Sequence, residues 1–211
     1  MNEIRLTERD EKIIKELDRW RVIQSKHIKH LTEFSGQRAC ERRLRKLIEA
    51  GYIKRERILY GVAGLYSNTN KAKLIVAGLN TNQKIRVEQI QHDIAVLDTA
   101  IYFNQKHGIQ FSQMTTEIEL HRRDGFGNRK HRPDFVITTA GAKTICVEVE
   151  LSLKSKDRFL ANIQNNFLDY DKQVWIVIDE NTKVADILRD NIIQYPNIKI
   201  LTLEEVRKID E

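Results

Sequence analysis

The chain has 211 residues, of which 41% are hydrophobic and 31% are charged, and this length suits one large domain or two small ones. No stretch approaches the roughly 20 apolar residues of a membrane span, and the first residues lack the apolar core of a signal peptide. Cys40 and Cys146 are too few for a disulfide framework or a zinc site. Composition therefore predicts an ordinary cytoplasmic globular protein with no membrane partner.

Charge is divided unevenly along the chain. Residues 1–84 hold 19 Lys and Arg against 10 Asp and Glu, a net charge of +9, whereas residues 85–211 hold 17 against 20, a net charge of −3. A basic half predicts a polyanionic partner, because neutralising phosphates releases counterions and drives binding. A solvated, Lys-rich surface has the same net charge, so the pattern of elements has to decide between the two interpretations.

Three helices are predicted in the basic half. Thr7 and the acids after it are typical of a helix start, and apolar residues then recur at helical spacing. A second, short helix begins at Ser25, and a third runs from about Gln37 to Ala50 and stops at Gly51. The side of the third helix away from its apolar residues presents Gln37, Arg38, Glu41, Arg42, Arg45 and Lys46. Such a face can enter a major groove.

Two short strands, residues 52–60 and 65–67, are predicted around a turn that contains Gly61 and Gly64. Together with the basic third helix, they make residues 7–67 resemble a winged helix-turn-helix domain. The resemblance implies that the third helix reads a groove of double-stranded DNA and that the wing holds backbone phosphates. The residues implied are Arg38, Arg42 and Arg45 on the helix and Lys54, Arg55 and Arg57 on the wing. A winged helix used for protein contacts is the alternative.

A connecting segment separates the two halves. Residues 69–79 show a helical pattern, residues 80–83 are polar, and a long amphipathic helix is expected from Arg86 to about Lys106. We place the domain boundary near residues 80–84, so that 1–80 forms a winged helix DNA-binding domain and 85–211 forms a second domain.

The second half alternates helices and strands and predicts an α/β (α+β) sandwich with a mixed sheet. The expected elements are a strand over 115–120, a basic loop over 121–132, strands over 135–138 and 144–151, a helix built on Phe159, Ile163, Phe167 and Tyr170, a strand over 174–178, a helix over 183–193 and a strand over 198–203. The strand over 174–178 is apolar throughout, as a strand covered on both faces should be.

Two carboxylates on neighbouring strands are the main candidate site. Side chains alternate across a strand, so Glu148 and Glu150 share one face of theirs while an apolar set occupies the other. Burial would penalise these acids unless something pairs with them. Asp134 lies at the start of the preceding strand, and carboxylates on adjacent strands can bind one hard cation, Mg²⁺ or Mn²⁺. Such a metal activates water for phosphate cleavage.

The pattern Pro133-Asp134 followed by Glu148-Val149-Glu150 resembles the PD-(D/E)XK nuclease superfamily. That resemblance implies metal binding by Asp134 and Glu148, with a Lys two positions further on; Glu150 stands there instead, and Lys154 is a downstream substitute. The basic loop supplies further DNA-contact candidates, namely Arg122, Arg123, Arg129, Lys130 and Arg132. Asn166 and Tyr170 are similar to a Gln-x-x-x-Tyr element of some members.

A winged helix, then His92-Asp93, then the Pro-Asp strand and the acidic strand resemble the replication-relaxation family of plasmid and mobile-element proteins. The resemblance implies DNA binding in replication or transfer, with replication or transfer proteins and a second copy of the chain as family-level partners. It leaves cleavage open. The hypotheses are a Mg²⁺- or Mn²⁺-dependent endonuclease, a regulator or accessory protein that binds DNA without cutting it, and a C-terminal module for protein contacts or dimerisation.

Overall fold

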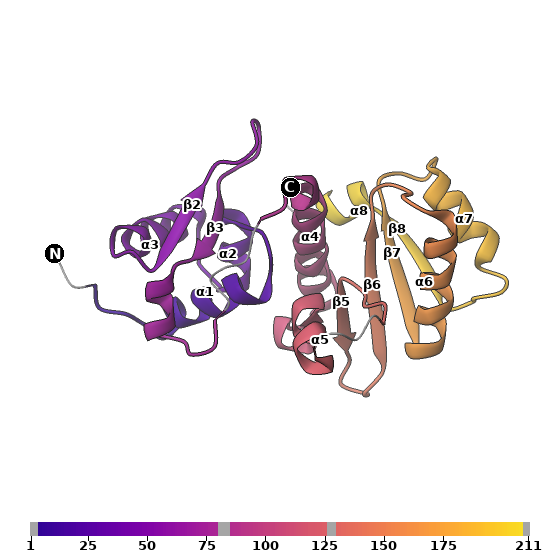
Figure 1. Ribbon diagram of the computed structural model, residues 1–211, viewed down its shortest axis with the longest axis horizontal. Coiled ribbons are helices and arrows are strands. Elements are labelled where there is room, and N and C mark those ends of the chain that lie inside the picture. The colour runs from indigo at the N-terminus through magenta and orange to yellow at the C-terminus, as the bar shows by residue number, and fades with distance from the viewer. Residues whose placement is uncertain (1–3, 80–84, 126–129, 209–211) are drawn as a thin grey trace. The chain divides into compact units, whose positions relative to one another are not determined.

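A computed structural model describes residues 4–79, 85–125 and 130–208, and it shows a mixed α/β protein (Figure 1). The chain divides into two compact units, Met1–Leu97 (unit 1) and Asp98–Glu211 (unit 2). The division falls inside α4, Ile90–His107. The boundary predicted near residues 80–84 lies outside the described residues, so it stays a prediction.

Unit 1 contains the three predicted helices, α1 (Glu8–Arg19), α2 (Ser25–Leu31) and α3 (Gln37–Glu49). The predicted cap of α1 is present: the Asp10 carboxylate accepts a hydrogen bond of 2.7 Å from the Thr7 backbone N–H, which closes a capping box. The helices bury apolar residues that recur at helical spacing, among them Ile13, Ile14, Leu17, Ile28, Leu31, Leu44 and Leu47.

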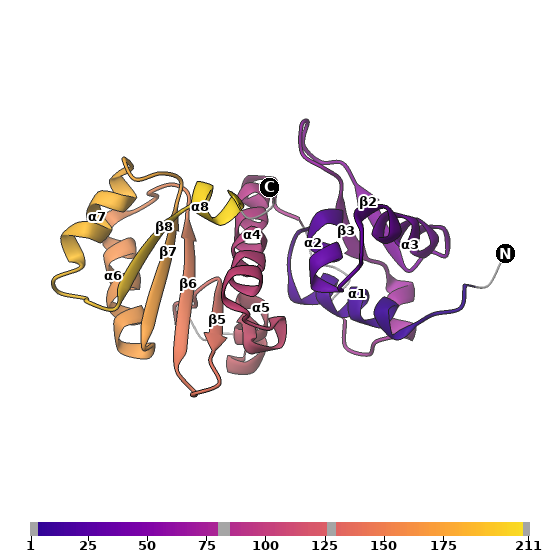
Figure 2. The same ribbon diagram turned by 180° about the vertical axis from the view of Figure 1, so that it is seen from behind.

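A small antiparallel sheet completes unit 1. Its strands are β1 (Ile23–Gln24), β2 (Ile53–Glu56) and β3 (Leu65–Asn68), in the order β1-β3-β2. The hairpin predicted after the third helix is therefore present. Figures 1 and 2 show that the segment between β2 and β3 projects from the helices of this unit.

The helix predicted over 69–79 is wrong for most of its length. A 3-10 helix, η1, covers only Asn70–Leu74. The Thr69 side chain accepts from the Lys71 N–H and favours this tight first turn. Ala72 is buried but Leu74 is 81% exposed, so the segment buries too little apolar surface to extend it into an α-helix.

The long helix predicted from Arg86 is present as the 3-10 turn η2 (Val87–Gln89) followed by α4. Unit 2 is built on a five-stranded mixed sheet in the order β4-β5-β6-β7-β8. Its first two pairings are antiparallel and its last two are parallel. The strands are β4 (Met114–Thr116), β5 (Phe135–Thr138), β6 (Thr144–Glu150), β7 (Lys172–Val177) and β8 (Ile198–Thr202).

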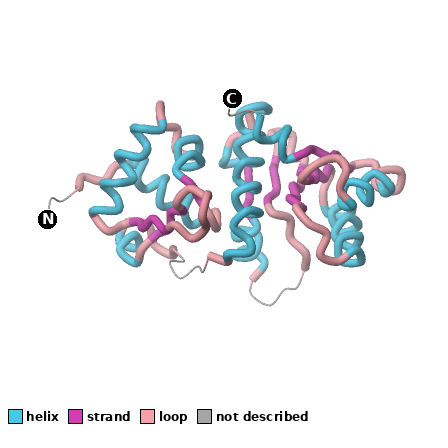
Figure 3. The backbone as a smooth tube through the Cα atoms, turned by 90° about the horizontal axis from the view of Figure 1, so that it is seen from above, coloured by secondary structure: helices cyan, strands magenta, loops and turns pink. Residues whose placement is uncertain are grey.

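Helices cover both faces of this sheet, as the view from above shows (Figure 3). On one face, α6 (Lys156–Asp169) and α7 (Lys183–Asn191) form an apolar cluster with Trp175 and Val177 of β7. On the other, Phe103 of α4 makes an edge-on ring contact with Phe135, with centroids 6.3 Å apart. Short helices η3 (Phe111–Gln113) and α8 (Leu203–Arg207) flank β4 and β8.

The strand predicted over 115–120 is wrong for most of its length. Its first residues lie in β4, but Glu117–Asp124 form the helix α5. A capping box decides the outcome: the Glu119 N–H donates to the Thr116 hydroxyl at 3.3 Å, and the Glu119 carboxylate accepts from the Thr116 N–H at 2.8 Å. This local signal outweighs an imperfect alternation of polar and apolar residues.

Candidate functional site

Three arginines form an exposed row on α3. The residues that α3 buries follow one another at helical spacing and are Cys40, Leu44 and Leu47. Arg38, Arg42 and Arg45 lie on the opposite side and are exposed. Long cationic side chains on the exposed face of a helix can contact an anionic surface while unit 1 stays folded.

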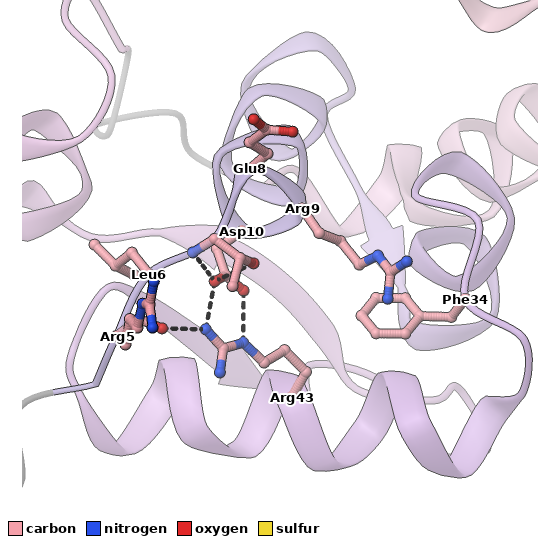
Figure 4. Close-up of a pocket in the computed structure, with 8 residues that line it drawn as sticks. Arg5, Leu6, Glu8, Arg9, Asp10, Phe34 and Arg43 are labelled. Carbon is pink, nitrogen blue, oxygen red and sulfur yellow. Dashed lines mark hydrogen bonds and ion pairs between the residues drawn. The ribbon is translucent and has the colours of Figure 1, made fainter.

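Arg43 fixes α3 to the start of α1 (Figure 4). Its Nε donates to Asp10 Oδ1 at 2.7 Å, and its Nη2 donates both to Asp10 Oδ2 and to the Arg5 carbonyl, the latter at 2.9 Å. The Asp10 side chain is wholly buried and that of Arg43 is 21% exposed. A bidentate, largely desolvated pair of this kind sets the orientation of α3 within unit 1.

The pKa of Asp10 lies below its ordinary value. Burial raises the pKa of this carboxyl, but the hydrogen bonds from Arg43 and Thr7 and the charge of Arg43 outweigh that effect. A carboxyl with a lowered pKa stabilises the fold while it is ionised. The Asp10–Arg43 contact therefore stabilises unit 1 at neutral pH.

Asp10→Asn is expected to lower the free energy of unfolding by about 2 kcal/mol at neutral pH, the scale of a hydrogen bond to a charged group. The difference from the native chain should be complete above the ordinary carboxyl pKa of about 4 and should vanish as pH falls through the lower pKa of folded Asp10. Urea unfolding at a series of pH values measures both stabilities. Parallel pH profiles for the two proteins would contradict this role.

The wing residues lie on β2 and just beyond it. Lys54, Arg55 and Arg57 are exposed, and Lys54 pairs with Glu56 at 2.8 Å. The Arg55 side chain crosses Gly64, where a Cβ would collide with it. Arg55 is thereby held along the hairpin, whereas nothing in the described contacts of Arg57 fixes that side chain.

In unit 2, the two predicted carboxylates lie on or beside neighbouring strands. Asp134 immediately precedes β5, and its Oδ2 accepts from the Val149 N–H at 2.7 Å. Glu148 lies within β6, next to Val149, and is 8% exposed. The expectation that both acids converge on one part of the sheet therefore agrees with the fold, because Asp134 reaches across to β6.

Glu148 is held by two side chains from different elements. His131, in the segment before β5, places Nε2 at 2.6 Å from Glu148 Oε1, within hydrogen-bonding distance. Asn166 of α6 is 1% exposed and donates to the same oxygen at 2.8 Å. The face of β6 that carries Glu148 is thus the face packed against α6, and the buried acid has the partners that burial requires.

The pKa values of His131 and Glu148 are both raised. Burial lowers the pKa of His131, but the hydrogen bond to Glu148 and the charges of Glu148 and Asp134 outweigh it, so the pKa is raised. Burial raises the pKa of Glu148, Asp134 adds to the rise, and His131 and Asn166 oppose it. Both groups therefore hold a proton to a higher pH than the free side chains do.

The other two catalytic candidates lie apart from this contact. Glu150 is half-buried at the end of β6, and Lys154 is exposed in the segment between β6 and α6. No hydrogen bond joins Lys154 to Asp134 or Glu148 in the described structure. Its role as a substitute for the nuclease Lys stays a prediction.

Magnesium binding by Asp134 and Glu148 stays a prediction, and one oxygen of each carboxylate is engaged by other protein groups. Within the ranges that the structure describes, no three His, Cys, Asp or Glu side chains gather so as to hold a metal ion. Oε1 of Glu148 is taken by His131 and Asn166, and Oδ2 of Asp134 by Val149. Mg²⁺ requires near-octahedral oxygen ligands, and here the His131 ring lies against Glu148 Oε1, one of the oxygens that such a site would use.

The predicted basic loop over 121–132 is partly helical. Arg122 and Arg123 are exposed on α5, and exposed Lys130 pairs with Asp169 at 2.8 Å. The Arg132 side chain is only 4% exposed and donates to Asp124 at 3.0 Å, so we assign it a structural role instead of a DNA contact. Arg129 lies outside the described residues.

Sequence reasoning missed two residues that organise these sites, His131 and Arg43. A signal existed for each of them. A buried acid on β6 requires a partner, and His131 lies in the polar segment just before Asp134. Arg43 lies on the flank of α3, between its apolar and its exposed sides, where an arginine often packs against a neighbouring helix.

Comparisons with known proteins give no assignment. No family model matches the chain, and no curated protein matches it. Among the helices in the described part of the chain, none is long and apolar enough to cross a membrane. Functional inference therefore depends on the side chains and their geometry.

Proposed function

We propose that the protein binds double-stranded DNA through unit 1, with α3 in the major groove and the wing on the backbone. The exposed row of Arg38, Arg42 and Arg45 on α3 is the observation that carries this proposal. Three helices followed by an antiparallel hairpin support a winged helix-turn-helix interpretation of the unit. In such domains the second helix of the helix-turn-helix lies in the major groove.

The charge distribution supports a polyanionic partner of unit 1. Residues 1–84 carry a net charge of +9, and residues 85–211 carry −3. Several basic residues of unit 1 are already paired, as Arg43 is with Asp10. In the described structure, Arg38, Arg42 and Arg45 of α3 form no such pair, so their charge is available to phosphates.

For unit 2 we propose a nuclease-like PD-(D/E)XK scaffold that no longer cuts. The contact of His131 with Glu148 supports this over an active endonuclease, because it compensates the carboxylate that a metal would need. The protein would then be a DNA-binding accessory in replication or transfer of a plasmid or mobile element, a role that rests on family resemblance. A homodimer on two half-sites stays a prediction.

DNA binding is tested by titrating a fluorescently labelled duplex with the full chain and following anisotropy. We expect saturable binding that unlabelled duplex displaces. A chain that leaves the anisotropy unchanged at low salt would refute the proposal.

Incubation of supercoiled and linear DNA with the native chain and Mg²⁺ or Mn²⁺ is expected to leave the DNA uncut, because Glu148 is compensated by His131. Asp134→Ala and Glu148→Ala are controls for contaminating nucleases. Cutting by a contaminant would be the same with either variant as with the native chain. Metal-dependent cutting by the native chain that disappears in both variants would establish an active nuclease and contradict the scaffold proposal.

A further inference from the structure

An aromatic side chain stands at the tip of the wing. Tyr60 lies in the segment between β2 and β3 and is fully exposed, unlike Tyr66, which packs in the sheet. Gly61 follows it with φ +74°, a left-handed conformation that lets the chain reverse there. The segment projects from the helices of unit 1 in both views (Figures 1 and 2).

The base of this segment is anchored although its tip is exposed. Ile58, Leu59 and Val62 pack against an apolar cluster that contains Val22, Leu65, Ile90 and Ile94. The Val62 N–H donates to the Leu59 carbonyl at 3.4 Å and closes a turn around Tyr60. Apolar residues on both sides of Tyr60 are therefore drawn into the unit, and the turn presents the aromatic ring outward.

Basic residues precede Tyr60 on this hairpin. Arg57 is exposed in the same segment, and Lys54 and Arg55 are exposed on β2. Cations that neutralise phosphates, combined with an aromatic ring that offers a flat face, form the usual platform for a nucleobase.

We propose that Tyr60 stacks on a base of the bound DNA, so that the wing prefers duplex sites where base stacking is interrupted. A ring of this size cannot stack on a base inside a continuous stack, because the neighbouring base pairs occupy both of its faces. An unpaired or already unstacked base removes that cost. This inference rests on the proposed DNA binding and names the class of DNA that the wing favours.

The test compares two labelled duplexes of equal length, one fully paired and one with a short unpaired patch at its centre. We expect the native chain to bind the patched duplex about tenfold more tightly, the scale of one base–aromatic stack. Tyr60→Ala should remove this preference and retain binding to the paired duplex. Tyr60→Phe should keep the preference, because it keeps the ring. Leu74→Ala, which removes another exposed apolar side chain of unit 1, is the matched control.

A 2-aminopurine placed in the unpaired patch gives a second readout, since its fluorescence falls when a ring stacks on it. We expect quenching by the native chain and by Tyr60→Phe, and none by Tyr60→Ala. Equal affinity of native chain and Tyr60→Ala for the patched duplex would overturn this inference alone. Failure of the native chain to bind either duplex would overturn the proposed function, and this inference with it.

Discussion

Alanine at Arg38, Arg42 and Arg45 together is expected to lower the affinity of the chain for duplex DNA by roughly 100-fold. Each arginine–DNA contact is worth about 1 kcal/mol or more, and every 1.4 kcal/mol changes the dissociation constant about tenfold. The three side chains are exposed, so their removal should leave the folding of unit 1 intact. Fluorescence anisotropy with a labelled duplex measures the change.

A matched triple variant separates a specific contact from a general loss of charge. The control replaces three exposed residues of unit 2, Lys172, Lys183 and Lys199, by alanine. It removes the same number of positive charges as the α3 variant. The proposal places the DNA on unit 1, so the charges of unit 2 make no direct contact with it, and we expect this variant to bind within about twofold of the native chain. Equal losses in the two triple variants would contradict a role for α3.

His131→Leu is expected to lower the free energy of unfolding by about 3 kcal/mol and the melting temperature by about 10 °C. The cause is the Glu148 carboxylate, which stays buried after its charged partner has gone. Thermal unfolding followed by circular dichroism measures the effect. His121→Leu is the matched control: His121 meets Glu117 at 3.4 Å with its side chain 47% exposed, and its loss should cost under about 0.5 kcal/mol.

The effect of His131→Leu should depend on pH. The raised pKa of His131 means that its stabilisation is complete below the ordinary histidine pKa of about 6.5 and is lost as pH rises through the raised value. The stability difference between native chain and variant should therefore shrink at alkaline pH. The double variant His131→Leu with Glu148→Leu should recover part of the loss. An equal loss at every pH without recovery would contradict the ion pair.

Much of the sheet of unit 2 could be predicted because its strands carry strong local patterns. The apolar run from Val174 is covered on both faces, and the alternation around Glu148 identified the face that needs polar partners. The predicted strand over 115–120 was wrong because Thr116 and Glu119 form a capping box, a signal that alternation does not contain. Local capping chemistry decided that segment.

The candidate sites were predictable in their positions and less so in their contacts. Asp134 and Glu148 occupy neighbouring strands as expected, yet the partner that changes the chemistry, His131, lies 17 residues from Glu148. Arg43 reaches Asp10 across 33 residues. Such pairings depend on how separate elements pack, and a single sequence contains no direct signal for them.

The most direct test of DNA binding by unit 1 is the salt dependence of duplex affinity. If the three wing cations meet phosphates while the α3 arginines contact base edges, the logarithm of the binding constant should fall against the logarithm of salt concentration with a slope of about −3. Tight binding with that dependence is the result we predict. A binding constant that is independent of salt, or no binding at low salt, would contradict it.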